Sequence, residues 1–259
     1  MGEVSTEEQQ PGAAAASRLT RDVGPPIPRP PRPTPFLVGF YRSALGKKAV
    51  MAVTGIALLG YVLVHMLGNL KLYLGMEDFD HYAEWLRTIG EPALPATAFL
   101  WIMRIGLLLA VVFHIHAAYA LTRLNRKARP VRYQSHRDYI AANFASRTMR
   151  WTGVIVVLFV IFHLMDLTWG NANPDFVRGD TYDNIVHSFQ RVPVAIFYIV
   201  ANLALGLHIF HGAWSMFQSL GLNNPRFNLW RRYFAAGLAA VVTIGNVSFP
   251  LMVVTGVVK

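Results

Sequence analysis

The sequence predicts an all-α, polytopic membrane protein with five transmembrane helices in a bundle. Hydrophobic residues make up 54% of its 259 positions, charged residues only 15%, and the mean hydropathy is +0.35, which is unlike a soluble domain of this length. Five apolar stretches each approach the roughly 20 residues that cross a hydrocarbon core of about 30 Å. They are residues 49–75, 95–122, 151–169, 193–218 and 233–258.

The segments around these stretches predict the domain organisation. Residues 1–35 contain the proline-rich run GPPIPRPPRPTP and no apolar core of signal-peptide length, so we expect a disordered cytoplasmic tail. Residues 36–48, FLVGFYRSALGKK, predict an interfacial amphipathic segment ahead of the transmembrane domain at 49–259. Loop 76–92 is expected to form a short interfacial helix, and loop 170–192 is rich in turn residues.

The basic residues predict the orientation of the chain. Of the 24 Lys and Arg residues, 18 lie in the N-terminal tail and the even-numbered connections, and five lie on the opposite side. That opposite side also holds nine of the 14 acids. The positive-inside rule then places the N-terminus in the cytoplasm and the C-terminus outside. The net charge of +10 is explained by basic loops that face anionic lipid or an acidic protein partner, without nucleic acid.

Each of the first four apolar stretches carries histidine. His65 lies in the first, His114 and His116 in the second, His163 in the third, and His208 and His211 in the fourth. Ionisable side chains inside a membrane are costly and usually face the bundle interior, where they mark functional sites. No cysteine is present, so this chain cannot supply thiolate ligands or attach haem covalently.

Depth along the helices groups these histidines. At about 1.5 Å per residue, His65 lies about 25 Å and His163 about 20 Å from the cytoplasmic ends of their helices. His114 lies about 13 Å from the cytoplasm, and His208 about 22 Å below the outer surface. Two pairs at two heights suit two stacked haems, whose iron takes one axial imidazole from each side. A zinc site prefers four ligands, and a proton relay needs interleaved carboxylates.

The motifs then indicate a family. They are SALGKKAVMAVTG and HMLGNL in the first stretch, FHIHAAYALTRLNRKARP in the second, RWTG with FVIFH in the third, and HIFHGAWSMFQSLGLNNPR in the fourth. Over residues 36–258 the chain resembles the single-subunit, five-helix, diheme cytochrome b membrane anchor of succinate dehydrogenases and fumarate reductases. In that family one histidine from each of the first four spans binds haem.

The resemblance implies an outer, distal haem b on His65 and His163 and an inner, proximal haem b on His114 and His208. Its partners would be a flavoprotein and an iron–sulfur subunit on the cytoplasmic face of a bacterial plasma membrane. Electrons from succinate would pass through the two haems to menaquinone, linking the tricarboxylic acid cycle to the respiratory chain. Some relatives carry a proton-path glutamate where this chain has Gly206.

Further residues are candidates for cofactor contacts. Arg104 could meet a distal haem propionate or a quinone carbonyl, or reach the outer surface, and His211 could meet proximal propionates or a neighbouring helix. For the quinone we expect the outer end, with Glu91, Trp169, Trp85, Arg104 and Asp166 as candidates. A rival cytoplasmic site would use His136, Trp230 and Arg231.

Two other functions fit part of the pattern. One is a cytochrome b anchor of another quinone-linked enzyme, a hydrogenase or formate dehydrogenase. The other is a histidine-lined metal or proton transporter.

Overall fold

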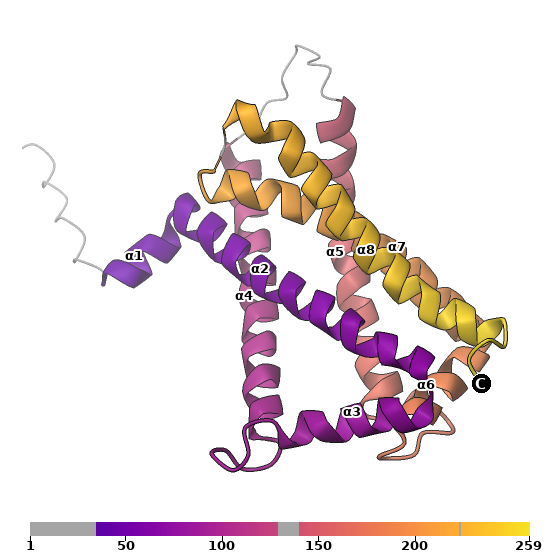
Figure 1. Cartoon of the computed structure of the whole chain (residues 1–259). Coiled ribbons are helices and arrows are strands. Elements are labelled where there is room, and N and C mark those ends of the chain that lie inside the picture. Colours follow the sequence, from indigo (N-terminus) through magenta and orange to yellow (C-terminus); the bar gives the residue numbers. More distant parts are fainter. Residues whose placement is uncertain (1–34, 129–139, 223) are drawn as a thin grey trace, which may run out of the picture. The chain divides into compact units, whose positions relative to one another are not determined.

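The computed structural model describes residues 35–128, 140–222 and 224–259, and every regular element in these ranges is helical. The helices are α1 (Phe36–Arg42), α2 (Ala44–Asn69), η2 (Leu70–Leu74), α3 (Met76–Thr88), α4 (Ala98–Ala128), α5 (Ile140–Leu167), α6 (Thr181–Gln190), α7 (Val192–Ser219), η3 (Pro225–Phe227) and α8 (Asn228–Val254) (Figure 1). The prediction of an all-α fold is confirmed for this part of the chain. The predicted tail lies outside the described residues up to position 34.

Within the described ranges, five helical stretches are long and apolar enough to cross a membrane, as predicted. They are Ala44–Leu74, Ala98–Ala128, Thr148–Leu167, Val192–Ser219 and Pro225–Val254. Large apolar side chains on these helices are widely exposed, for example Leu108 at 64% and Ile244 at 70%. Such side chains suit lipid, because a helix satisfies its own backbone hydrogen bonds and can present apolar groups to the hydrocarbon.

By its contacts the chain divides into residues 1–36 and residues 37–259. Within the larger unit, α4 packs along α2 and α5 packs along α7, while α7 also packs against α2 and α8. The apolar core lies where α2, α5, α7 and α8 meet, and includes Met66, Phe159, Tyr198 and Phe249. Two antiparallel helix pairs, α2 with α4 and α5 with α7, therefore form the frame that carries the histidines.

The first transmembrane helix begins earlier than residue 49. The 36–48 segment is divided at Ser43, whose hydroxyl accepts a hydrogen bond from the Gly46 amide at 2.9 Å and caps α2. Such a cap satisfies one of the free amides at a helix start. The part of the segment before Ser43 forms α1, and the part after it is the first turn of the membrane-spanning helix.

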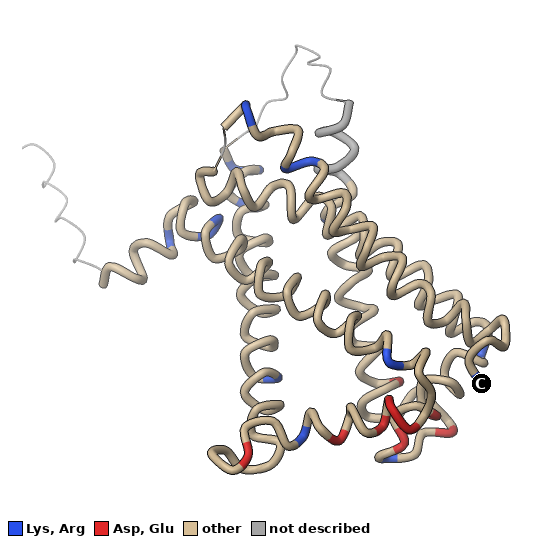
Figure 2. Tube along the Cα trace, viewed as in Figure 1, with Lys and Arg blue, Asp and Glu red and all other residues tan. Residues whose placement is uncertain are grey.

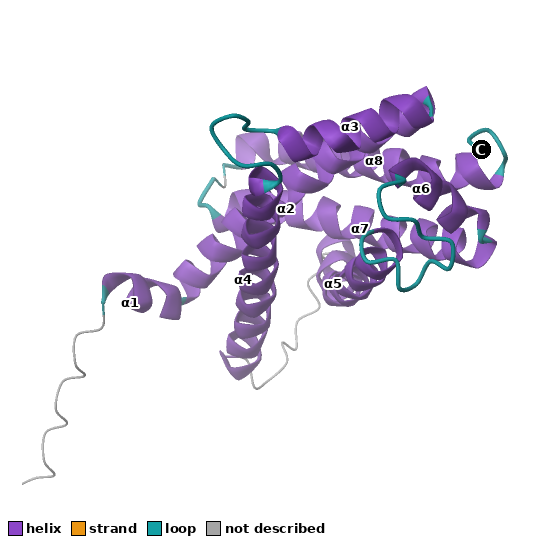
Figure 3. Cartoon of the chain, turned by 90° about the horizontal axis from the view of Figure 1, so that it is seen from below, coloured by secondary structure: helices purple, strands orange, loops and turns teal. Residues whose placement is uncertain are grey.

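The two short helices α3 and α6 pack against each other at one end of the bundle (Figures 1 and 3). A helix in loop 76–92 was expected, and α3 confirms it. Helix α6 was not expected, because its neighbours in 170–192 are turn residues. It forms because Tyr182, Val186 and Phe189, spaced along one face, are all buried. Figure 2 shows that the described acidic residues gather at this end.

Candidate haem-binding site

His114 of α4 and His208 of α7 face each other within the bundle. Their ring centroids are 6.4 Å apart, with 63° between the ring planes. The two residues belong to different helix pairs, since α4 packs on α2 and α7 on α5. The pair predicted from depth for the inner level is therefore brought together by the fold.

A threonine from the partner helix of each pair contacts each inner histidine. Thr54 Oγ1 lies 3.2 Å from His114 Nδ1, and the carbonyl of Met51 lies 3.1 Å from the same nitrogen. A carbonyl only accepts hydrogen bonds, so Nδ1 of His114 carries the proton. The opposite nitrogen, Nε2, then keeps its lone pair, which is the form in which an imidazole binds a metal.

The contact at His208 repeats this arrangement. Thr152 donates its hydroxyl proton within α5, to the carbonyl of Thr148 at 3.0 Å, and its oxygen lies 3.3 Å from His208 Nδ1. The oxygen is thus oriented to accept from Nδ1–H. Both inner histidines are therefore held in the tautomer that leaves Nε2 free.

The residue after each threonine is a glycine that lies against the histidine ring. A Cβ on Gly55 would lie 3.3 Å from Cε1 of His114, which is tighter than an ordinary contact, whereas a Cβ on Gly153 would lie 3.5 Å from Cε1 of His208, which is an ordinary van der Waals contact. Gly55 therefore gives the His114 ring room beside α2, while the His208 ring would still fit beside an alanine at position 153. Gly206 has another role, because its missing Cβ would collide with Oγ1 of Thr243 on α8.

These contacts reveal an internal repeat that the sequence reasoning missed. Both α2 and α5 read Thr-Gly followed by histidine eleven residues after the threonine, TGIALLGYVLVH at 54–65 and TGVIVVLFVIFH at 152–163. The signal was present in the sequence, but its meaning depends on the next helix of each pair. In each pair the Thr-Gly of the first helix supports the inner histidine of the second.

His65 of α2 and His163 of α5 form the outer pair. Their ring centroids are 6.0 Å apart, with 85° between the planes. Tyr61 stacks on His65 with centroids 5.4 Å apart and 13° between the planes. Asn69 Nδ2 lies 3.4 Å from His65 Nε2, at the long limit of a hydrogen bond.

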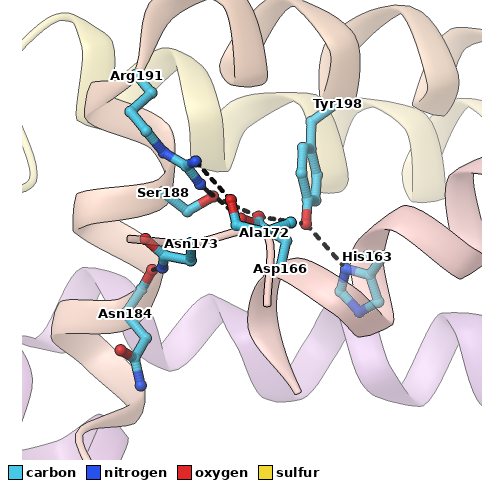
Figure 4. Close-up of polar contacts among 8 residues, drawn as sticks. All are labelled: His163, Asp166, Ala172, Asn173, Asn184, Ser188, Arg191 and Tyr198. Carbon is cyan, nitrogen blue, oxygen red and sulfur yellow. Dashed lines mark hydrogen bonds and ion pairs between the residues drawn. The ribbon is translucent and has the colours of Figure 1, made fainter. Parts of the chain in front are cut away.

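A buried polar cluster lies behind His163 (Figure 4). The hydroxyl of Tyr198 lies 3.3 Å from His163 Nδ1 and donates to Asp166 Oδ2 at 2.9 Å. Asp166 is fully buried and pairs with Arg191 at 2.5 Å, while Ser188 also donates to it. Asp166 therefore lies in the protein interior, and none of its oxygen atoms faces the outer interface where a quinone donor was expected.

Both histidine pairs have the spacing of axial ligands on one iron. An imidazole nitrogen binds a metal at about 2 Å and its ring centroid lies about 1 Å further, so two opposed rings have centroids about 6 Å apart. The two measured separations, 6.0 and 6.4 Å, agree with this geometry. No group of three or more His, Asp or Glu side chains in the described ranges could share a metal ion, so the donor sets fit haem better than zinc.

The other predicted site residues fall into two groups. Arg104 is exposed and lies over the ring of Trp101 at 5.1 Å, Glu91 is exposed, and Trp169 is 56% exposed. Among the described residues, none of these three makes a hydrogen bond or ion pair with a histidine of either pair. His211, in contrast, is buried, and its Nδ1 has no hydrogen-bond partner, as is also true of the Trp214 indole nitrogen.

The remaining residues near the inner end have structural partners. His116 Nδ1 lies 2.5 Å from the Tyr41 hydroxyl, and the two rings stack. Arg231 is buried and donates to the Leu222 carbonyl at 2.8 Å, which ties the loop after α7 to α8. His136 lies outside the described residues.

The structure thus defines a polytopic helical membrane protein with two intramembrane histidine pairs. Residues 122–247 match the family of succinate dehydrogenase/fumarate reductase transmembrane subunits. The match includes His163 and His208 and supports the family that the motifs indicated. It begins at residue 122, near the end of α4, so His65 and His114 lie outside it. Searches among curated proteins and solved structures found no match.

Proposed function

We propose that this chain is the membrane anchor and electron-transfer subunit of a succinate dehydrogenase or fumarate reductase and holds two haems b. The single observation that carries the proposal is the pair of facing histidines, twice repeated, with centroids 6.0 and 6.4 Å apart. The family match over residues 122–247 supports the enzyme class. The substrate site for succinate would lie on another subunit.

In this proposal His65 and His163 hold the outer haem, and His114 and His208 hold the inner haem. Bound haem supplies one-electron redox chemistry, which lets a membrane subunit connect an iron–sulfur partner with a quinone. The protein's own contribution is to orient each imidazole. Thr54 and Thr152 accept from Nδ1 of the inner ligands, and Gly55 gives the His114 ring room.

His211 and Trp214 are proposed to hydrogen-bond a propionate of the inner haem. Both lie within two turns of His208 on α7 and each has a buried polar nitrogen without a partner. Buried donors are rarely left unpaired, because losing their hydrogen bonds to water costs about 1–3 kcal/mol. A carboxylate at this level would satisfy both.

Menaquinone is proposed to react at the outer end, near α3 and the outer histidine pair. The residues we predict for this site are Glu91, Arg104 and Trp169. A nearby cavity of about 250 Å³ is lined by Lys71, His81, Tyr82 and Trp85, which offer a cation and an aromatic wall. Quinone reduction needs proton donors close to the carbonyls, and this end has them.

The proposed orientation places the N-terminus in the cytoplasm of a bacterial cell and the C-terminus outside. The flavoprotein and iron–sulfur subunits would then bind at the end opposite α3 and α6, where most of the basic residues of 37–128 and 219–232 occur. Basic connections facing the cytoplasm are the usual arrangement in membrane proteins.

The test is to purify the complex and record its reduced-minus-oxidised spectrum, haem content and succinate:quinone activity. We expect two b-type haems per chain. His208→Ala should abolish one haem, whereas the matched controls His211→Ala and His116→Ala should keep both. A wild-type complex without haem would overturn the proposal and leave a histidine-lined transporter as the explanation, and two haems without succinate activity would favour another quinone-linked enzyme.

The side of quinone reduction has its own test. If protons are taken up from outside, the membrane potential assists electron transfer from succinate to menaquinone, so an uncoupler should slow this turnover in intact membranes. The same turnover in detergent, where no potential exists, should not respond. An equal rate with and without uncoupler in intact membranes would contradict reduction at the outer side.

A further inference from the structure

The hydrogen-bond acceptors behind the two histidine pairs differ in charge. Behind His114 and His208 the acceptors are all neutral. They are the hydroxyls of Thr54 and Thr152, whose own protons go to backbone carbonyls of the same helix, and the backbone carbonyls of Met51 and Met149. Behind His163 the acceptor is Tyr198, whose proton goes to a carboxylate. Only the outer pair, among these described contacts, is connected to an acidic side chain.

The direction of the outer hydrogen bonds follows from their chemistry. Asp166 receives Arg191 at 2.5 Å and Ser188 at 2.5 Å, so it is an ionised carboxylate and accepts hydrogen bonds only. Tyr198 must therefore donate to Asp166, at 2.9 Å, and its oxygen is left to accept from Nδ1–H of His163 at 3.3 Å. His163 then presents Nε2 as its ligand nitrogen.

Because Asp166 is buried, its negative charge can affect His163 even though Tyr198 lies between the two residues. Asp166 has no exposed surface, whereas the side chain of Arg191 is 28% exposed. Water therefore screens the charge of Arg191 more than that of Asp166. Arg191 also donates a hydrogen bond to the Ala172 carbonyl at 2.7 Å (Figure 4). In a low-dielectric interior, each hydrogen bond in such a chain polarises the next.

When a histidine binds a metal through one ring nitrogen, a hydrogen bond from its other ring nitrogen to an acceptor orients the ring and raises its basicity. A more basic imidazole donates more electron density and favours the oxidised metal. Resting on the haem assignment proposed above, we propose that Tyr198, linked to Asp166, is a positioning residue that holds the reduction potential of the outer haem below the value a neutral environment would give. The inner haem, supported by threonines, lacks this effect.

The test is Tyr198→Phe in the complete complex, with potentiometric titration of both haems. The variant removes only the hydroxyl and keeps Asp166 paired with Arg191 and Ser188. We expect two haems per chain and, for one of them, a roughly tenfold shift of the oxidised-to-reduced ratio toward the reduced form. For a one-electron couple this is a rise of about 59 mV.

Two variants serve as controls. Tyr182→Phe removes a hydroxyl of the same kind at the same end, but that hydroxyl donates to the Lys259 carbonyl and contacts no histidine; neither potential should change. Thr152→Val removes one of the two acceptors of His208 and leaves the Met149 carbonyl, so it should shift only the other haem and leave the one that responds to Tyr198→Phe unchanged. The electron paramagnetic resonance signal of each oxidised haem should change in the same variants.

Three results would overturn the inference. They are unchanged potentials in Tyr198→Phe, an equal shift of both haems, and a similar shift in Tyr182→Phe. Each leaves the proposed function intact as long as the wild-type complex contains two haems. Absence of haem from the wild type is the result that removes the proposed function itself, so the two failures are distinguishable.

Discussion

Replacing Gly206 by alanine tests a close contact between two helices of the bundle. Gly206 is buried on α7, and a Cβ there would collide with Oγ1 of Thr243 on α8 and lie 3.3 Å from its Cβ. Either Thr243 must rotate or the two helices must separate. Overpacking of this kind costs about 1–3 kcal/mol, so we expect Gly206→Ala to lower the thermal midpoint of the purified protein by several degrees, measured by circular dichroism in detergent.

The matched control is Gly237→Ala on α8, where a Cβ would meet no atom within 4 Å. This variant should be at least as stable as the wild type, because alanine favours helix over glycine. Adding Thr243→Ala to Gly206→Ala should recover part of the loss, since the colliding oxygen is gone. A Gly206→Ala variant that melts at the temperature of the control, or that recovers no stability when the Thr243 hydroxyl is removed, would contradict a collision between α7 and α8. A glutamate at position 206 would likewise require Thr243 to rotate or α8 to move.

Three further predictions concern other parts of the chain. Asp166→Asn should lower the free energy of unfolding by about 2–3 kcal/mol, less than for a fully buried ion pair because Arg191 is 28% exposed; a thermal midpoint equal to that of the wild type would contradict this. Tyr41→Phe removes the partner of His116, and the haem content should stay at two per chain, while loss of a haem would make His116 a ligand. The chain has no cysteine, so single substitutions can be labelled without background: Asp175→Cys should react with an impermeant maleimide in intact cells and Arg126→Cys only after permeabilisation, and the reverse result would invert the topology.

Much of the membrane architecture follows from the sequence, because crossing a bilayer imposes a length and a composition that hydropathy measures directly. The depths of the histidines in the membrane could be predicted from the sequence for a similar reason. A helix has a fixed rise, so distance from a charged end becomes depth. Depth alone thus predicted two pairs, His65 with His163 and His114 with His208. The fold brings the same residues together.

The supporting residues could not be predicted in the same way. Tyr198 stands in an apolar helix ten residues before His208, and only the packing of α7 on α5 aims its hydroxyl at His163. Asp166 was expected at the outer interface, since an acid near a helix end usually reaches water. It is buried instead because α6, a helix within a turn-rich loop, brings Ser188 over it. Arg191, which lies between the end of α6 and the start of α7, also pairs with it.

The division of each histidine pair between the two helix pairs affects how the protein is assembled in the membrane. Each helix pair contributes one histidine to the outer pair and one to the inner pair, so neither half of the chain contains both members of either pair. Under the proposed assignment, the outer site receives its second imidazole when α5 is inserted, and the inner site receives its second imidazole only when α7 follows. Haem would then join the two helix hairpins only after both have been inserted. A chain cut between α4 and α5 should regain its haems only when both fragments are expressed together.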